Sequence, residues 1–233
     1  MYTEQLRANL ERVEERISRA LERVGRADTV RVVAVTKGHP AEAVRAAVAC
    51  GLHDIGENRV QELEAKRVEV SGSGIEVRWH LIGHLQRNKV RRAVQLMDMI
   101  HSIDSLRLAR ELALEAERAG VEVRGLVQVN VSGEETKGGF DAARAVDEIA
   151  QVASLAHLRC EGLMTMAPLT DDTAVVRKTF AGARALLERC RDEDVGLSGA
   201  ELSMGMSGEY EIAIEEGSTM LRLGTVLFGE RAQ

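Results

Sequence analysis

Short apolar runs alternate with longer amphipathic segments along almost the whole chain. The runs are rich in β-branched and other apolar residues, and they predict eight β-strands over residues 30–35, 53–56, 77–83, 99–103, 124–131, 158–164, 200–204 and 220–223. The segments between them carry apolar residues at helical spacing and predict helices over 41–50, 59–68, 88–96, 105–119, 142–155, 173–192 and 207–216. Another amphipathic helix is predicted over residues 4–24, with Thr3 as its N-cap and one stripe formed by Leu6, Leu10, Val13, Ile17 and Leu21.

Strands that alternate with helices pair in parallel, because each helix returns the chain to the same edge of the sheet. Eight such units are typical of a closed (β/α)8 barrel, or TIM barrel, of about 250 residues. We therefore predict an α/β fold with a single domain over residues 1–233, in which the segment 1–26 packs on the barrel. No helix is predicted after the eighth strand, so we expect the N-terminal helix to cover that position. An open doubly wound sheet is the alternative that the same alternation allows.

Charge and cysteine usage narrow the possible partners. The net charge of −6 argues against nucleic acid, whose phosphates require a basic surface. The one basic cluster, Arg87, Lys89, Arg91 and Arg92, is expected to be the solvated face of a helix start. The three cysteines are far apart, as is typical of a reducing compartment, and no apolar run predicts a signal peptide or a membrane span. We expect a cytoplasmic monomer with no nucleic-acid or membrane partner.

Lys37 is the first candidate for chemistry. It is the last residue of the first apolar run, and Gly38-His39-Pro40, directly after it, is a sequence that ends a strand. A lone amine at the end of a buried strand is what the capture of a carbonyl compound needs. An unperturbed lysine has a pKa of about 10.4, and we expect partial burial and the cation Arg222 to lower the pKa of Lys37.

Polar residues gather at the other predicted strand ends, where the functional residues of such barrels lie. They include Asn58, Thr165, Ser203, Ser207, Gly208, Arg222, Gly224 and Thr225. The segments 204–208 and 222–225 follow strands seven and eight, the usual phosphate-binding position in this fold. Ser207 is predicted to cap the next helix, and Arg222 supplies a positive charge. An amine and a phosphate cradle at one mouth suggest pyridoxal phosphate (PLP) as the cofactor.

Other site types are disfavoured. His80 and His84 are four residues apart but lack an acidic third ligand, so we predict no metal site. The chain contains no Gly-x-Ser-x-Gly elbow, Walker loop or dinucleotide fingerprint.

The motifs, taken in order, resemble those of the pyridoxal phosphate homeostasis protein family, which is itself similar to the barrel half of alanine racemases and ornithine decarboxylases. The resemblance runs from residue 33 to residue 229. It is carried by the segments 33–37, 56–62, 79–83, 85–89, 101–104, 162–164, 202–207, 213–214, 217–219 and 222–229. Two positions depart from the family pattern. His39 stands where many relatives have a second lysine, which puts a two-lysine relay beside Lys37 in doubt, and His84 stands where proline is common.

The resemblance implies roles for the candidate residues. Lys37 would form the Schiff base with PLP, and Asn58 would sit beside the ring. Ser207, Gly208, Arg222, Gly224 and Thr225 would surround the phosphate, and Ser203 is counted with the cofactor-binding residues. Whether Arg222 faces the phosphate or the pyridine nitrogen stays open. Lys137 matches a family lysine implicated in cofactor handling, and a solvated loop lysine is the alternative.

The same cofactor allows a carrier or an enzyme. A racemase needs an acid or base on each face of the bound amino acid, and the relatives take one from a second domain or a partner subunit. The chain ends four residues after Gly229, so we expect no such domain, and neither Tyr2 nor Tyr210 falls at a predicted strand end. We therefore predict a non-catalytic PLP carrier that exchanges PLP with apo-enzymes. A PLP-dependent racemase is the main alternative, and a Schiff-base aldolase acting on a sugar phosphate is the third.

Overall fold

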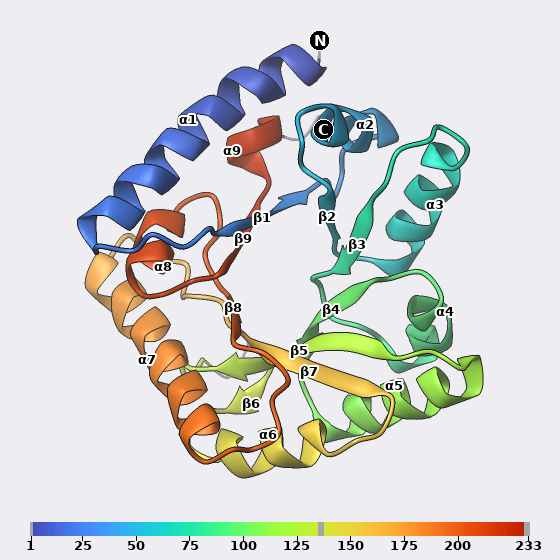
Figure 1. Cartoon of the computed structure of the whole chain (residues 1–233), viewed down its shortest axis with the longest axis vertical. Helices are drawn as coiled ribbons and strands as arrows, with labels where there is room; N and C mark the ends of the chain where they lie inside the picture. The colour runs from blue at the N-terminus through green and yellow to red at the C-terminus, as the bar shows by residue number, and fades with distance from the viewer. Residues whose placement is uncertain (1, 135–137, 231–233) are drawn as a thin grey trace.

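A computed structural model describes residues 2–134 and 138–230 and shows a closed barrel of parallel strands inside a ring of helices (Figure 1). Around the barrel the strands follow in the order β1 (Arg31–Val35), β2 (Asp54–Glu57), β3 (Arg78–Leu81), β4 (Met99–Ile103), β5 (Val123–Asn130), β7 (Leu158–Met164), β8 (Glu201–Ser203) and β9 (Met220–Leu223). Because β1 pairs with both β2 and β9, and β4 pairs with β5, the sheet closes on itself. The predicted (β/α)8 barrel is confirmed, and the open-sheet alternative is wrong.

One short strand lies outside the predicted set. β6 (Phe140–Asp141) pairs only with the end of β5, through Val129 with Phe140 and Asn130 with Asp141. It extends the barrel wall at the mouth where the strands end. Two residues are too few to give an alternating pattern, so the sequence offered no signal for it.

The helices are α1 (Tyr2–Arg23), α2 (Ala41–Ala49), α3 (Val60–Val70), the 3₁₀ turn η1 (Arg87–Lys89), α4 (Val90–Val94), α5 (Leu106–Ala119), α6 (Ala145–Ala153), α7 (Thr173–Asp192), α8 (Tyr210–Glu215) and α9 (Thr225–Phe228). Two of them correct the sequence prediction. α8 begins at Tyr210 and not at Ser207, and α9 is a helix after the last strand, where none was expected. A helix of one turn is too short to show helical periodicity.

α1 packs on the outside of the barrel against α2, α8 and α9, as Figure 1 shows. Its apolar stripe faces inward, with Leu6, Leu10, Val13 and Ile17 buried in the same core as the barrel helices. The helix begins at Tyr2, so Thr3 lies inside it and is not its N-cap. α1 therefore lies over α9 and does not fill the place of a missing helix.

The barrel interior is separate from the core between strands and helices. An apolar cluster fills part of it, formed by Val33, Met99, Leu126, Met164 and Met220. Buried polar side chains share this interior: Asp54, His80, His101, Ser203 and Arg222. The sequence pattern did not predict this polar content, because buried parallel strands usually carry apolar residues.

A buried ion pair fastens the end of β1 to α3. Lys66 Nζ donates to the carbonyl oxygen of Thr36 and to Glu57 Oε1, both at 2.6 Å. Thr36 Oγ1 donates to the same Glu57 oxygen at 2.5 Å. Burial raises the pKa of Glu57, and the nearby Glu62 adds to this, while the hydrogen bonds from Lys66 and Thr36 oppose it. The network fixes Thr36, the residue directly before Lys37.

We expect Lys66→Met to destabilise the protein by about 3–5 kcal/mol at pH 8, because it leaves the Glu57 carboxylate buried without its cation. The folded-state pKa of Glu57 would then rise further above its unfolded value, so the folded variant binds more protons than the unfolded chain. Its free energy of unfolding should therefore fall as pH rises from 5 to 8. Urea denaturation at both pH values measures this.

The matched control is the double variant Lys66→Met with Glu57→Gln, which removes both charges and should lose the added pH dependence. A Lys66→Met protein as stable as the wild type at pH 8 would contradict the expectation.

Candidate functional site

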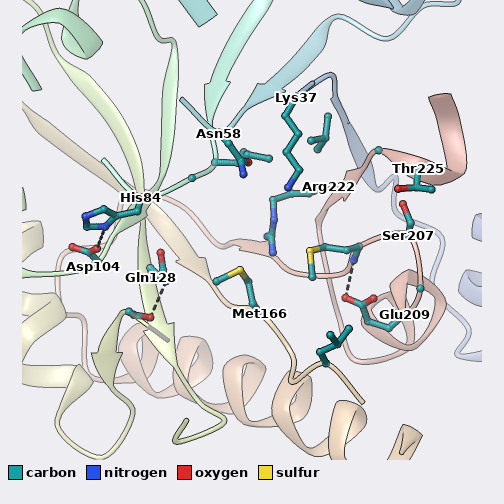
Figure 2. A pocket seen from close by; sticks show the side chains of 18 of the residues that line it. Lys37, Asn58, His84, Asp104, Gln128, Met166, Ser207, Glu209, Arg222 and Thr225 are labelled. Carbon is teal, nitrogen blue, oxygen red and sulfur yellow. Dashed lines mark hydrogen bonds and ion pairs between the residues drawn. The ribbon is translucent and has the colours of Figure 1, made fainter. Parts of the chain in front are cut away.

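A cavity of about 750 Å³ opens at the barrel mouth where the strands end (Figure 2). Seven of the eight residues that the sequence predicted for the site line it: Lys37, Asn58, Ser207, Gly208, Arg222, Gly224 and Thr225. The eighth, Ser203, is fully buried beneath the cavity and contacts Arg222. The barrel thus brings together residues from β1, β2, β9 and the loop after β8.

Lys37 extends from the end of β1 into the cavity. Its side chain is half-buried, and Figure 2 shows its amine on the side of Arg222. The backbone turns directly after it, with the N–H of His39 donating to the carbonyl oxygen of Thr36 at 2.9 Å. The buried ring of His39 packs against the ring of Phe228 in α9, with centroids 5.4 Å apart. His39 therefore connects the turn after Lys37 to the helix after β9.

Arg222 is a buried cation at the floor of the cavity. Its Nη1 donates to the carbonyl oxygen and to Oγ of Ser203, at 2.9 and 2.7 Å, and its Nη2 donates to the carbonyl oxygen of Thr165 at 2.9 Å. Burial lowers its pKa to about 10, although the negative charge of Glu209 opposes the change, so Arg222 remains charged at neutral pH. No carboxylate among the described residues lies within 4.0 Å of it. The charge is solvated only by neutral oxygens, which makes the floor attractive to an anion or an electron-rich ring.

The loop after β8 and the start of α9 form one wall. Ser207 Oγ accepts a hydrogen bond from the backbone N–H of Val226 at 3.2 Å, so Ser207 caps α9 and not α8, which corrects the prediction. Within the described parts of the chain, no acceptor is found for the backbone N–H groups of Ser207, Gly208 and Thr225. All three residues line the cavity, so this wall offers backbone donors that a ligand would satisfy.

Glycines allow this wall to form. Gly205 has a φ of +95°, and a Cβ there would lie 2.6 Å from the Cβ of Ala213 in α8, so the loop can pack on α8 only without a side chain. At Gly208, by contrast, an added Cβ would meet no atom within 4 Å. The space beside the backbone of Gly208 is therefore not filled by other protein atoms.

The opposite wall contains residues that sequence reasoning missed as site residues. His84 Nδ1 lies 2.8 Å from Asp104 Oδ2, and Gln128 Nε2 donates to the carbonyl oxygen of Gly138 at 2.8 Å. Met166 and Glu209 also line the cavity (Figure 2). His84, Asp104 and Met166 follow strand ends within three residues, which is the signal that could have identified them, whereas Gln128 lies within β5 and Glu209 directly before α8. Lys137 lies outside the described residues.

The charges in the cavity favour an anionic ligand with a carbonyl group. Among the described lining residues, Lys37 and Arg222 are the cations. The carboxylates are Asp104, which is bonded to His84 at the opposite wall, and Glu209, whose Oε1 accepts the N–H of Met206 at 3.0 Å. The positive charge is therefore concentrated around Lys37 and Arg222. In the parts of the chain that the structure describes, no group of three potential metal ligands is found, and no helix has the length and apolar character that a membrane span requires. The arrangement can hold a phosphate at one wall and present a primary amine to a carbonyl carbon.

Comparison with known proteins places this architecture in a family. The family model for the N-terminal domain of alanine racemase matches residues 6–232. The chain is 40% identical over 224 residues to the pyridoxal phosphate homeostasis protein of Aquifex aeolicus, covering 95% of this chain and 96% of the relative. It is 40% identical to the protein of that name from Pseudomonas aeruginosa, covering 96% of this chain and 94% of the relative.

Solved structures agree with this placement. PipY of Synechococcus elongatus with PLP bound is 39% identical and has a TM-score of 0.81, with 91% of this chain and 100% of PipY covered. An alanine racemase from Clostridium difficile is 19% identical with a TM-score of 0.77, and it covers 99% of this chain and 58% of the racemase, which shows the shared fold. The chain therefore belongs to the alanine racemase N-terminal domain family, among the pyridoxal phosphate homeostasis proteins.

Proposed function

We propose that this protein binds PLP at Lys37 and acts as a reversible carrier that exchanges PLP with apo-enzymes. The observation that carries the proposal is the meeting, in one cavity, of the Lys37 amine, the buried cation Arg222 and three backbone N–H groups for which the described residues supply no acceptor. An aldehyde phosphate is the ligand class that uses all of these groups. The relatives that share the chain's length are named for PLP homeostasis, and PipY has a structure with PLP bound.

The residues present fit this cofactor. The backbone N–H groups of Ser207, Gly208 and Thr225 would hold the phosphate, together with the side-chain hydroxyl groups of Ser207 and Thr225. Figure 2 shows Ser207 and Thr225 side by side at one edge of the cavity, with Arg222 nearer the centre and Asn58 beyond it. We therefore assign the phosphate to the Ser207–Thr225 wall and the ring to the space between Arg222 and Asn58.

When bound, the PLP aldehyde supplies a reversible condensation with a primary amine, and Lys37 is placed to provide that amine. Thr36 and the Lys66–Glu57 pair fix the backbone before it, and His39 packs the turn after it. These residues orient the amine and hold the turn in place.

The lining residues favour a carrier over a racemase. No tyrosine is among the described residues that line the cavity. Tyr210 is buried under α1, with the Arg16 guanidinium 5.1 Å from its ring centre. His84 is tied to Asp104 and its side chain is largely exposed. A matched acid–base pair on the two faces of a bound amino acid is what a racemase needs.

We expect the protein mixed with PLP to gain a visible absorption band that Lys37→Ala lacks, because the variant has no amine at the end of β1. Borohydride reduction followed by peptide mapping should place the label on the peptide that contains Lys37. Lys178→Ala on the exposed face of α7 is the matched control and should keep the band. A band of equal strength in Lys37→Ala would contradict the assignment.

The carrier proposal has its own test. PLP-loaded protein incubated with pure L-alanine or D-alanine should leave the enantiomer unchanged, as followed by circular dichroism. Steady racemisation at ordinary enzymatic rates, about 1 per second or faster, would establish an enzyme instead.

A negative charge introduced into the Ser207–Thr225 wall tests whether the phosphate binds there. Gly208→Asp should weaken PLP binding about 100-fold, because it sets a carboxylate against the phosphate, while the added Cβ meets no atom within 4 Å. Binding of pyridoxal, which lacks the phosphate, should hardly change. Gly208→Asn is the neutral control of the same shape. Equal losses for PLP and pyridoxal would show that the phosphate lies elsewhere.

A further inference from the structure

A line of buried polar side chains crosses the barrel interior from Arg222 toward the opposite mouth. Arg222 Nη1 lies 2.7 Å from Ser203 Oγ, which lies 3.0 Å from His101 Nδ1. His101 Nε2 lies 2.8 Å from His80 Nδ1, and His80 Nε2 lies 2.9 Å from Asp54 Oδ1. We call Ser203, His101, His80 and Asp54 the barrel relay. Its members come from four strands: β8, β4, β3 and β2.

The two ends of the relay fix its terminal hydrogen bonds, and with neutral histidines they fix the direction of the inner ones as well. A guanidinium can only donate, so Ser203 Oγ accepts from Arg222. Asp54 can only accept, because it is ionised. Burial acts to raise its pKa, but hydrogen bonds from Arg78 and His80 outweigh burial and lower it. Arg78 holds Asp54 with two bonds, Nε to Oδ1 at 2.8 Å and Nη2 to Oδ2 at 2.6 Å.

One pattern of protons satisfies these constraints with neutral histidines. Ser203 donates its hydroxyl proton to His101 Nδ1, His101 donates from Nε2 to His80 Nδ1, and His80 donates from Nε2 to Asp54. The opposite direction would set a lone pair of His80 against a carboxylate oxygen. Burial lowers the pKa of His101, and the positive charges of Arg222 and Arg31 add to this, which favours the neutral form.

The charged groups below the relay support the same arrangement. A cavity of about 140 Å³ at this end is lined by Arg31, Arg78, Arg124, Asp54, Asp98 and His80. Of the three arginines, Arg78 pairs with Asp54 itself, whereas Arg31 and Arg124 are paired with Glu201 and Glu161. Arg78 therefore keeps Asp54 ionised and an acceptor. The far mouth of the barrel is thereby connected to Arg222 through four side chains.

We propose that Ser203, His101 and His80 are positioning residues for Arg222, and that their one-directional hydrogen bonds hold its guanidinium in the place where it faces PLP. The proposal rests on the proposed function and deepens it. A serine hydroxyl that donates to His101 is a stronger acceptor for Arg222, because hydrogen bonds in a chain reinforce one another. Loss of the relay would leave Arg222 buried with one fewer oriented partner.

The first test determines which ring nitrogens of His80 and His101 carry protons in PLP-free protein. Spectra of protein with ¹⁵N-labelled histidine at pH 7.5 should show His80 and His101 as neutral rings protonated at Nε2. His80→Gln and His101→Asn assign the two signals. Protonation at Nδ1 in either ring, or averaging between both forms, would overturn the proposal. This result does not depend on PLP, so it separates failure of the relay from failure of the proposed function.

The second test reads PLP binding. His101→Leu should weaken the Kd for PLP about tenfold, since Ser203 loses its acceptor while no residue that lines the cavity changes. His101→Asn offers an oxygen to Ser203 and an amide N–H toward His80, so it should keep affinity within about twofold. His53→Gln, outside the barrel interior, is the control. Wild-type affinity in a folded His101→Leu protein would overturn the proposal.

Discussion

The parallel pairing of β1 with β9 closes the barrel and determines the site. Lys37 and Arg222 lie near opposite ends of the chain, yet the register sets Val33 opposite Arg222 and Ala34 opposite Leu223. The last residue of β1, Val35, therefore lies beside Gly224, so Lys37 leaves the sheet next to the start of α9, at the mouth where parallel strands end. Each of the two strands is buried on both faces, so a shift in their register would misplace the cavity floor as well as the core.

The fold stabilises its buried charged groups, both inside the barrel and between the strands and the helices, by giving each one fixed partners. Arg222 is surrounded by carbonyl and hydroxyl oxygens, Asp54 by Arg78 and His80, and Glu57 by Lys66 and Thr36. A buried charge without partners is strongly destabilising, so the fold can keep these charges only together with the groups that bind them. In two of them the partner residues act directly beside the proposed site: Lys66 behind Lys37, and Ser203 beneath Arg222.

Most of the architecture could be predicted from the sequence, because the strand and helix patterns are long and regular. Lys37, Asn58, Arg222 and the Ser207–Gly208 turn could be placed at one mouth, since the barrel requires strand ends to meet there. β6 and α9 were missed because two and four residues show no period. Ser207 was assigned to α8 because α8 follows it directly in the sequence, whereas the helix whose N–H it accepts, α9, begins only after the next strand and was not predicted. Ser203 was placed in the site because it ends a strand, whereas its side chain points below the cavity and contacts Arg222.

The polar interior could not be anticipated for a physical reason. His80, His101 and Asp54 lie in separate strands, and only barrel closure and register bring their side chains into line. Their spacing along the chain follows no motif. Gln128 reaches the cavity from within β5, and Glu209 reaches it from the turn before α8, so neither position follows directly after a predicted strand end.

The most direct test of the central claim is a crystal structure of the protein with PLP. The account predicts electron density continuous from Lys37 Nζ into the ligand, with the phosphate against the backbone of Ser207, Gly208 and Thr225 and the ring beside Arg222. PLP bound away from this cavity, or in it without a bond to Lys37, would contradict the account.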